Sequence, residues 1–171
     1  VGIGVRDRIR IGASGKITSA FDMARVLALG ADWCNAARGF MFAVGCIQAQ
    51  SCHTGACPTG VATQDPLRQR AIVVPDKAER VASFHRNTLH ALAELVAAAG
   101  LSHPSELRPH HFLRRASSDK VISLAEQYEQ LAPGQLTADP ASSPRFAEAW
   151  ASSSADSFAR AGGQARQGGG W

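Results

Sequence analysis

The sequence lacks several features that would place it in a particular class of protein. No hydrophobic run reaches the length of a membrane span. Basic residues form no block with interleaved aromatics, which make up only 6% of the chain, and this argues against nucleic-acid binding. Four cysteines are too few for a secreted disulfide framework, and no charged-then-apolar signal pattern opens the sequence. We therefore expect a cytoplasmic protein with no membrane segment and no nucleic-acid partner.

The rest of the composition is that of an ordinary globular domain. Hydrophobic residues make up 45% of the 171 residues, charged residues 19%, and the net charge is +4. Val1 stands in the middle of a structured pattern, which predicts that the chain is a piece of a longer polypeptide. From Thr137 onward Ala, Ser, Gly and Gln dominate, so we expect residues 137–171 to form a low-complexity, mostly disordered tail.

Three cysteines lie close together in the run GCIQAQSCHTGACPTGVATQ. Cys46, Cys52 and Cys57 have the spacing C-x5-C-x4-C. Three soft thiolates in one short loop suit an iron–sulfur cluster, whereas zinc sites use paired C-x2-4-C elements that this run lacks. Inert thiols tend to be buried singly in apolar elements, so three structural or free thiols are the less favoured interpretation.

The sequence leaves a fourth ligand of this cluster open. Cys34 lies in the middle of a predicted strand, and a place in the core explains it more simply. His53 adjoins Cys52, and a hydrogen bond within the loop is its simpler role. If neither residue is a ligand, three thiolates remain, which favours a 3Fe–4S cluster over a four-cysteine 4Fe–4S site.

The first half of the chain alternates between strand and helix patterns. Strands and helices are predicted in turn over residues 8–13, 19–29, 32–37 and 40–48. Ser19 and Asp22 have capping-box spacing at the start of the first helix, and Gly30 ends it. This β-α-β-α order with short turns is the unit of a parallel α/β fold.

The second half is predicted to be mainly helical. A long helix is expected over residues 77–99, with Asp76 and Glu79 as its capping box. The elements expected after it are a helical turn at residues 104–107, a turn at 110–115 and a weak helix at 121–130.

Each of the two predicted strands ends in a turn of small residues near a helix start. The turns consist of Ser14, Gly15 and Lys16, and of Ala36, Ala37, Arg38 and Gly39. In a parallel α/β barrel the last two strand-to-helix turns commonly form a phosphate cup, because small residues let the main chain approach the ligand. Lys16 or Arg38 could add positive charge. Small residues at strand ends are more often turn formers alone, so phosphate binding is a hypothesis.

These motifs lie in a stretch that resembles a known family. Residues 13–64, which contain both turns and the cysteine loop, strongly resemble the FMN-binding synthase domain of glutamate synthase, in particular the stand-alone bacterial proteins of the FMN-binding glutamate synthase family. Residues 84–115 resemble the continuation of that domain. The resemblance covers residues 5–136, and its most specific part is the cysteine loop with the GVATQ that follows it.

The resemblance implies a fold and its cofactors. Residues 1–136 would be the C-terminal part of a (β/α)8 TIM barrel, containing its last two strand–helix units, an iron–sulfur loop and C-terminal helices. The implied cofactors are FMN and a 3Fe–4S cluster. The residues that match the family's phosphate turns are Ser14, Gly15, Lys16, Ala36, Ala37, Arg38 and Gly39, and those that match the cluster ligands are Cys46, Cys52 and Cys57.

The resemblance also implies an oxidoreductase that converts 2-oxoglutarate to glutamate by reductive amination. In the family that the sequence resembles, reduced FMN gives a hydride to 2-iminoglutarate, and the cluster feeds electrons to the flavin. The nitrogen would come from ammonia or from glutamine, and the electrons from ferredoxin or an NAD(P)H-dependent subunit.

Two observations limit this expectation. Many relatives have an acidic residue followed by two glycines where this chain has Ser14, Gly15 and Lys16, which indicates a divergent branch. The first six barrel strands would be absent, so we expect the isolated chain to be inactive. The alternative hypothesis is a non-catalytic iron–sulfur or zinc-binding module.

Overall fold

The computed structural model describes residues 1–158, which divide into two compact units. The larger unit comprises Arg10–Tyr128, and the smaller comprises Val1–Ile9 together with the chain from Glu129 onward. Residues 159–171, the end of the predicted tail, lie outside the described residues. The predicted domain boundary at residue 136 stays a prediction.

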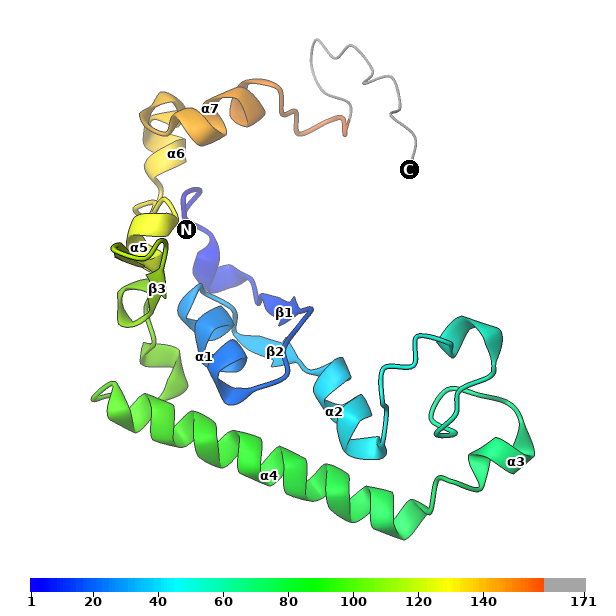
Figure 1. The fold of residues 1–171 in the computed structure, drawn as a ribbon. Coiled ribbons are helices and arrows are strands. Elements are labelled where there is room, and N and C mark those ends of the chain that lie inside the picture. Colours follow the sequence, from blue (N-terminus) through cyan, green and yellow to red (C-terminus); the bar gives the residue numbers. More distant parts are fainter. Residues whose placement is uncertain (159–171) are drawn as a thin grey trace. The chain divides into compact units, whose positions relative to one another are not determined.

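A short parallel sheet opens the larger unit (Figure 1). Strands β1 (Gly12–Ser14) and β2 (Trp33–Asn35) pair in parallel, with Gly12 opposite Trp33, and helix α1 (Ala20–Ala28) connects them. Gly12 leaves room for its neighbour, because a Cβ atom there would lie 2.6 Å from the Trp33 ring. The predicted β-α-β order is present, and the mixture of helices and small sheets is compatible with an α/β fold.

Helix α1 begins with the capping box that the sequence predicts. The N–H of Asp22 donates to Ser19 Oγ, and the N–H of Ser19 donates to Asp22 Oδ2. The N–H of Thr18 also donates to this oxygen, at 3.1 Å. Burial raises the pKa of the Asp22 carboxyl, but the hydrogen bonds from Ser19 and Thr18 outweigh burial, so its pKa lies below the ordinary value. The ionised carboxylate therefore fastens the chain where it enters α1.

The long helix α4 (Val74–Ala98) packs against both α1 and α2 (Ala37–Val44), as Figure 1 shows. It begins three residues earlier than predicted, with Val73 as its N-cap. Pro75 is tolerated in the first turn because the N–H groups there have no partner within the helix. The predicted capping box of Asp76 and Glu79 is therefore wrong, and Glu79 instead pairs with Arg86 at 3.0 Å.

The core of the larger unit forms where α1 meets α4 and the elements that follow it. Its buried side chains are Ala20, Ala24, Ala28, Leu92, Val96, Leu107, Phe112 and Leu124. Three alanines spaced four residues apart put the smallest side chains on one face of α1, so α4 can approach closely. Gly39 of α2 has a similar effect, since a Cβ atom there would lie 2.8 Å from the Phe84 ring of α4.

The end of the larger unit differs most from the predicted pattern. After α4 come η3 (Pro104–Glu106), η4 (Pro109–His111), strands β3 (Leu113–Arg115) and β4 (Val121–Ser123), and helix α5 (Leu124–Gln127). The turn at 104–107 is confirmed. The turn predicted at 110–115 and the helix predicted at 121–130 are wrong where β3 and β4 pair as an antiparallel hairpin. β-Branched Val121 and Ile122 favour the strand, and Ser123 with Glu126 then caps α5.

The smaller unit joins the start of the chain to its later segments. It contains η1 (Arg6–Arg8), α6 (Gln135–Ala138), η5 (Pro140–Ser142) and α7 (Pro144–Ala151). The N–H of Leu136 donates to the carbonyl of Gly2 at 2.9 Å, and a Cβ atom on Gly2 would lie 2.7 Å from Leu131. The described part of the predicted tail therefore includes helical segments. Among the described residues, no helix is both long enough and apolar enough to cross a membrane.

Candidate functional site

A cavity of about 580 Å³ lies at the carboxyl ends of β1 and β2. Three segments line it: the turn after β1, the start of α2 and the cysteine loop. The predicted site residues among its lining are Ser14, Gly15, Lys16, Ala37, Arg38, Cys46 and Cys52. The carboxyl ends of parallel strands are where α/β proteins usually bind ligands. The structure thus brings most of the predicted residues to one place.

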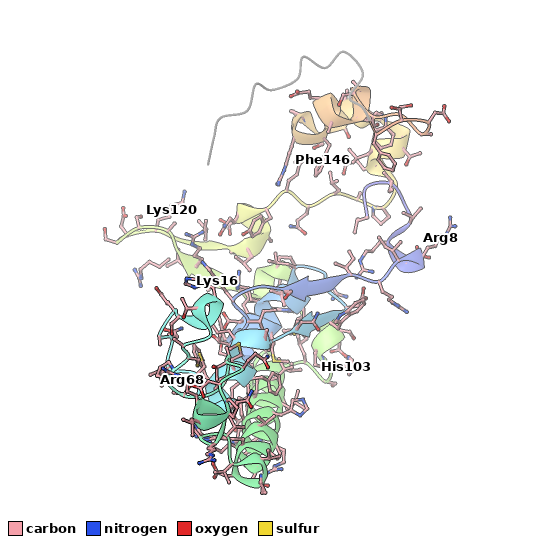
Figure 2. The ribbon with its side chains drawn as sticks, turned by 90° about the vertical axis from the view of Figure 1, so that its right-hand side faces the viewer. Arg8, Lys16, Arg68, His103, Lys120 and Phe146 are labelled. Carbon is pink, nitrogen blue, oxygen red and sulfur yellow. The ribbon has the colours of Figure 1, made fainter. Side chains whose placement is uncertain are left out.

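The turn after β1 presents open main chain to this cavity. Gly15 has a φ of 96°, and no heavy atom lies within 4 Å of the position that its Cβ would occupy. Lys16 follows with a φ of 55°, at a backbone cost of about 1 kcal/mol for a residue other than glycine. Its side chain is exposed and is labelled in Figure 2. Open main chain beside an ammonium group suits a phosphate.

The second turn contributes through the N-terminus of α2. Ala37 and Arg38 line the cavity, whereas Ala36 and Gly39 do not. The N-cap residue is Ala36, and it makes no side-chain hydrogen bond to the first turn. The first N–H groups of α2 therefore lack a side-chain cap, and this end of the helix favours an anion. Gly39 is buried against Phe84, so helix packing explains why it is a glycine.

The cysteine loop is fastened by its own hydrogen bonds. Arg68, which Figure 2 labels, lies on α3 (Pro66–Gln69), and its Nη1 donates to the carbonyl of Ala56 at 3.3 Å. The side chain of Gln69 donates to the carbonyl of Thr63 at 2.9 Å, and Thr63 Oγ1 donates to the carbonyl of Gly55. These bonds order a segment that has no regular periodicity in its sequence.

The three cysteines of the loop have different surroundings. Cys46 is half-buried and its sulfur accepts the N–H of Gln48 at 3.5 Å, Cys52 is exposed, and Cys57 is 7% exposed. Hydrogen bonds from the Thr59 hydroxyl and from the N–H groups of Ala62 and Thr59 lower the pKa of the Cys57 thiol to about 7. Such bonds favour the thiolate, which is the form that binds iron.

Thiol side chains are suitable ligands for an iron–sulfur cluster, but the structure does not bring all three cysteines together. Cys46 and Cys52 line the cavity and Cys57 does not. Within residues 1–158, no group of three His, Cys, Asp or Glu side chains is placed to hold a metal ion. Cys34 is only half-buried in β2, and burial raises the pKa of its thiol. The ring of exposed His53 makes no hydrogen bond in the described part of the chain. The assignment of the cluster ligands stays a prediction.

Gln48 and Gln50 are candidate site residues that the sequence pattern did not single out. Lys16, Gln48 and Gln50 have φ values of 55°, 58° and 56°, and in the described part of the chain no other residue except glycine has a positive φ. All three line this cavity. Backbone strain of this kind concentrates at functional sites. The signal available in the sequence was two amide side chains in the five-residue spacer between Cys46 and Cys52.

Comparison with known proteins places these residues in a family. Residues 1–102 match the family model described as the conserved region in glutamate synthase. The chain belongs to the glutamate synthase family. The part that matches the family includes both strand-end turns and the cysteine loop, and thus every predicted site residue.

Several relatives in the glutamate synthase family are much longer than this chain. The glutamate synthase large subunit-like protein YerD of Bacillus subtilis is 43% identical over 121 residues, which cover 71% of this chain and 23% of YerD. The archaeal glutamate synthase (NADPH) of Methanocaldococcus jannaschii is 37% identical over 105 residues, which are 61% of this chain and 21% of that enzyme. The ferredoxin-dependent glutamate synthase 2 of Synechocystis is 32% identical, with coverage of 70% and 8%. No solved structure matches the chain.

Proposed function

We propose that this chain forms the phosphate-binding and iron–sulfur end of a glutamate synthase-type oxidoreductase. The observation that supports it best is the cavity at the ends of β1 and β2, which is lined by residues of both predicted turns and by Cys46 and Cys52. In this proposal β1 and β2 are the last two strands of a (β/α)8 barrel. Ile11, which precedes β1, and Trp33 of β2 remain 41% and 48% exposed, whereas a parallel sheet is normally covered on both faces.

The residues present fit the phosphate of FMN. The open main chain of Gly15 and Lys16 and the uncapped first turn of α2 would donate hydrogen bonds to it, and Lys16 and Arg38 would balance its charge. Ala36 and Gly39 would shape the second turn through main chain and packing. Bound FMN would supply the hydride for reductive amination. The protein's contribution at this end is to fix the cofactor's phosphate and hence its orientation.

Cys46, Cys52 and Cys57 would be the ligands of a 3Fe–4S cluster. The N–H of Gln48 and the donors around Cys57 would hold two of these sulfurs as thiolates. The thiols do not meet at one point in this structure, so cluster binding requires the loop to draw them together, and no electron path follows from their present positions.

The proposed reaction takes 2-oxoglutarate and nitrogen from ammonia or glutamine in the cytoplasm. The names of two relatives mention NADPH and ferredoxin, and we propose one of these as the ultimate electron donor. The test is anaerobic purification of the complete gene product, followed by an absorption spectrum and metal analysis. Flavin bands with a broad brown shoulder are expected. Iron or zinc without flavin would instead favour the non-catalytic binding module.

A further inference from the structure

A second cavity, of about 440 Å³, lies in the larger unit and shares no lining residue with the first. It lies among α1, β3 and α5. Its lining includes Phe21 and Arg25 of α1, Phe112, all three residues of β3, and Gln127 and Tyr128 at the end of α5. Side chains of neighbouring strand residues point to opposite faces, so a cavity lined by three consecutive residues runs along the edge of the strand.

The edge of β3 that points away from β4 carries main-chain groups that β4 does not use. The N–H of Leu124 donates to the carbonyl of Phe112, and the N–H of Ala116 donates to the carbonyl of Lys120. Because hydrogen-bonded pairs alternate in an antiparallel ladder, Leu113 and Arg115 are in non-hydrogen-bonded pairs with β4. Their N–H and C=O groups therefore point outward, where a further strand could pair with them.

Positive charge surrounds this edge. Arg25, Arg114 and Arg115 all line the cavity, and Lys120 lies in the turn of the hairpin that Figure 2 shows. Within the described residues Arg25 and Arg114 form no ion pair, while Arg115 donates to the carbonyl of Ser118 at 3.0 Å. The nearby carboxylates of Asp119 and Glu126 are hydrogen-bonded to Ser117 and Ser123. The guanidinium groups of Arg25 and Arg114 are thus available to an acidic ligand.

An apolar wall completes the cavity. The rings of Phe21 and Phe112 meet edge to face at a centroid distance of 5.4 Å, yet Phe21 remains 52% exposed and Leu113 67% exposed. Gln127 Oε1, from the end of α5, is buried and has no hydrogen-bond partner among the described residues, so it can accept a hydrogen bond.

We propose that this groove binds an extended acidic peptide segment of a partner protein, which adds a strand to the outer edge of β3. The main chain of Leu113 and Arg115 would pair with the peptide backbone. Carboxylates on one face of the peptide would meet Arg114, and apolar side chains on its other face would pack on Leu113 and Phe21. This is strand addition, in which main-chain bonds give affinity and alternate side chains give specificity. A nucleic acid offers no backbone to pair with a strand edge, so a peptide is the better fit.

The test uses the complete gene product and a short blocked peptide with alternating Glu and Phe residues. Binding is measured by fluorescence anisotropy and by hydrogen exchange of the segment that contains β3. Arg114→Gln should weaken binding by about tenfold, because a charge-assisted hydrogen bond is lost. Arg80→Gln, on the exposed surface of α4, is the matched control and should leave binding unchanged. Raised salt should also weaken binding.

The backbone contribution is tested separately. A peptide of the same sequence with N-methylated amides keeps its charges but cannot pair with a strand edge, and it should not bind. The bound unmodified peptide should slow hydrogen exchange in β3 and leave α4 unaffected. Equal binding of the N-methylated peptide, of phenylacetate or of a single-stranded oligonucleotide would overturn the proposal, as would failure of the unmodified peptide to bind.

Discussion

Replacement of Gln48 and Gln50 by glycine separates the effect of their backbone conformation on stability from the effect of their amide side chains on cofactor binding. Each has a positive φ and each lines the cavity at the ends of β1 and β2. Glycine accepts this backbone conformation without strain, which is worth about 1 kcal/mol per position. Glycine also raises the conformational entropy of the unfolded chain, which lowers stability by about the same amount and offsets the relief of strain. We therefore expect the free energy of unfolding of each glycine variant to stay within about 1 kcal/mol of the parent value.

Flavin affinity should respond differently if the amide groups contact the cofactor. Loss of one hydrogen bond of about 1 kcal/mol corresponds to about fivefold weaker binding. Gln48→Gly and Gln48→Ala should both bind FMN about fivefold more weakly. Gln48→Asn retains an amide and tolerates a positive φ, so its FMN affinity should fall less. Alanine keeps the strain, so it should also be the least stable of the three.

The assays are a fluorescence titration of the apoprotein with FMN and urea unfolding of the same preparations, with the complete gene product as the parent. Glycine variants that gain stability and bind FMN at full strength would refute the reasoning. In that case the positive φ values would serve only to turn the loop, for example to direct the N–H of Gln48 toward Cys46 Sγ.

Three further predictions concern the same segments. Gly15→Val, at a φ of 96°, should strain the turn and fill the space left for the phosphate, so flavin content should fall while iron content is kept; undiminished flavin would exclude this turn. Cys52→Ser should abolish iron binding, and Cys34→Ser should not; the reverse result in an iron assay would show that the ligands are misassigned. The lowered pKa of Asp22 means that its contribution to stability is present above the ordinary carboxyl pKa and is lost as the pH falls through the folded-state value. Asp22→Asn should therefore destabilise the protein at neutral pH by about 1 kcal/mol in urea unfolding and should flatten the acid side of the stability profile; an unchanged profile would contradict this.

Local chemistry explains why the start of the larger unit could be predicted. Ser19, Asp22 and Gly30 act through contacts within one or two helical turns, and the structure has the capping box and a positive φ of 106° at Gly30. The strand limits were less accurate. Strand β1 occupies Gly12–Ser14 rather than residues 8–13, because strand length depends on the partner strand, which local sequence does not encode.

The hairpin β3–β4 could not be predicted from local pattern. Val121 and Ile122 precede a capped helix, and an apolar pair in that position also suits a helical face. The pairing of Arg115 with Val121 decides between the two structures, and the apolar pattern of residues 121–130 does not show that pairing. The start of α4 shows a similar effect at smaller scale, since Asp76 and Glu79 have capping-box spacing but lie inside the helix.

The two cavities differ in how much of each can be inferred from residue types. The proposed roles of Cys46, Cys52 and Gly15 depend on the residue type itself, so a site made of such residues leaves a pattern in the sequence. The groove beside β3 depends on which main-chain groups point outward, and any residue type except proline at Leu113 or Arg115 would provide the same N–H and C=O groups. A site built from main chain becomes visible only when the hydrogen-bond register is known. For that reason the structure reveals most at the hairpin of β3 and β4, which lies beyond the residues that match the glutamate synthase family model.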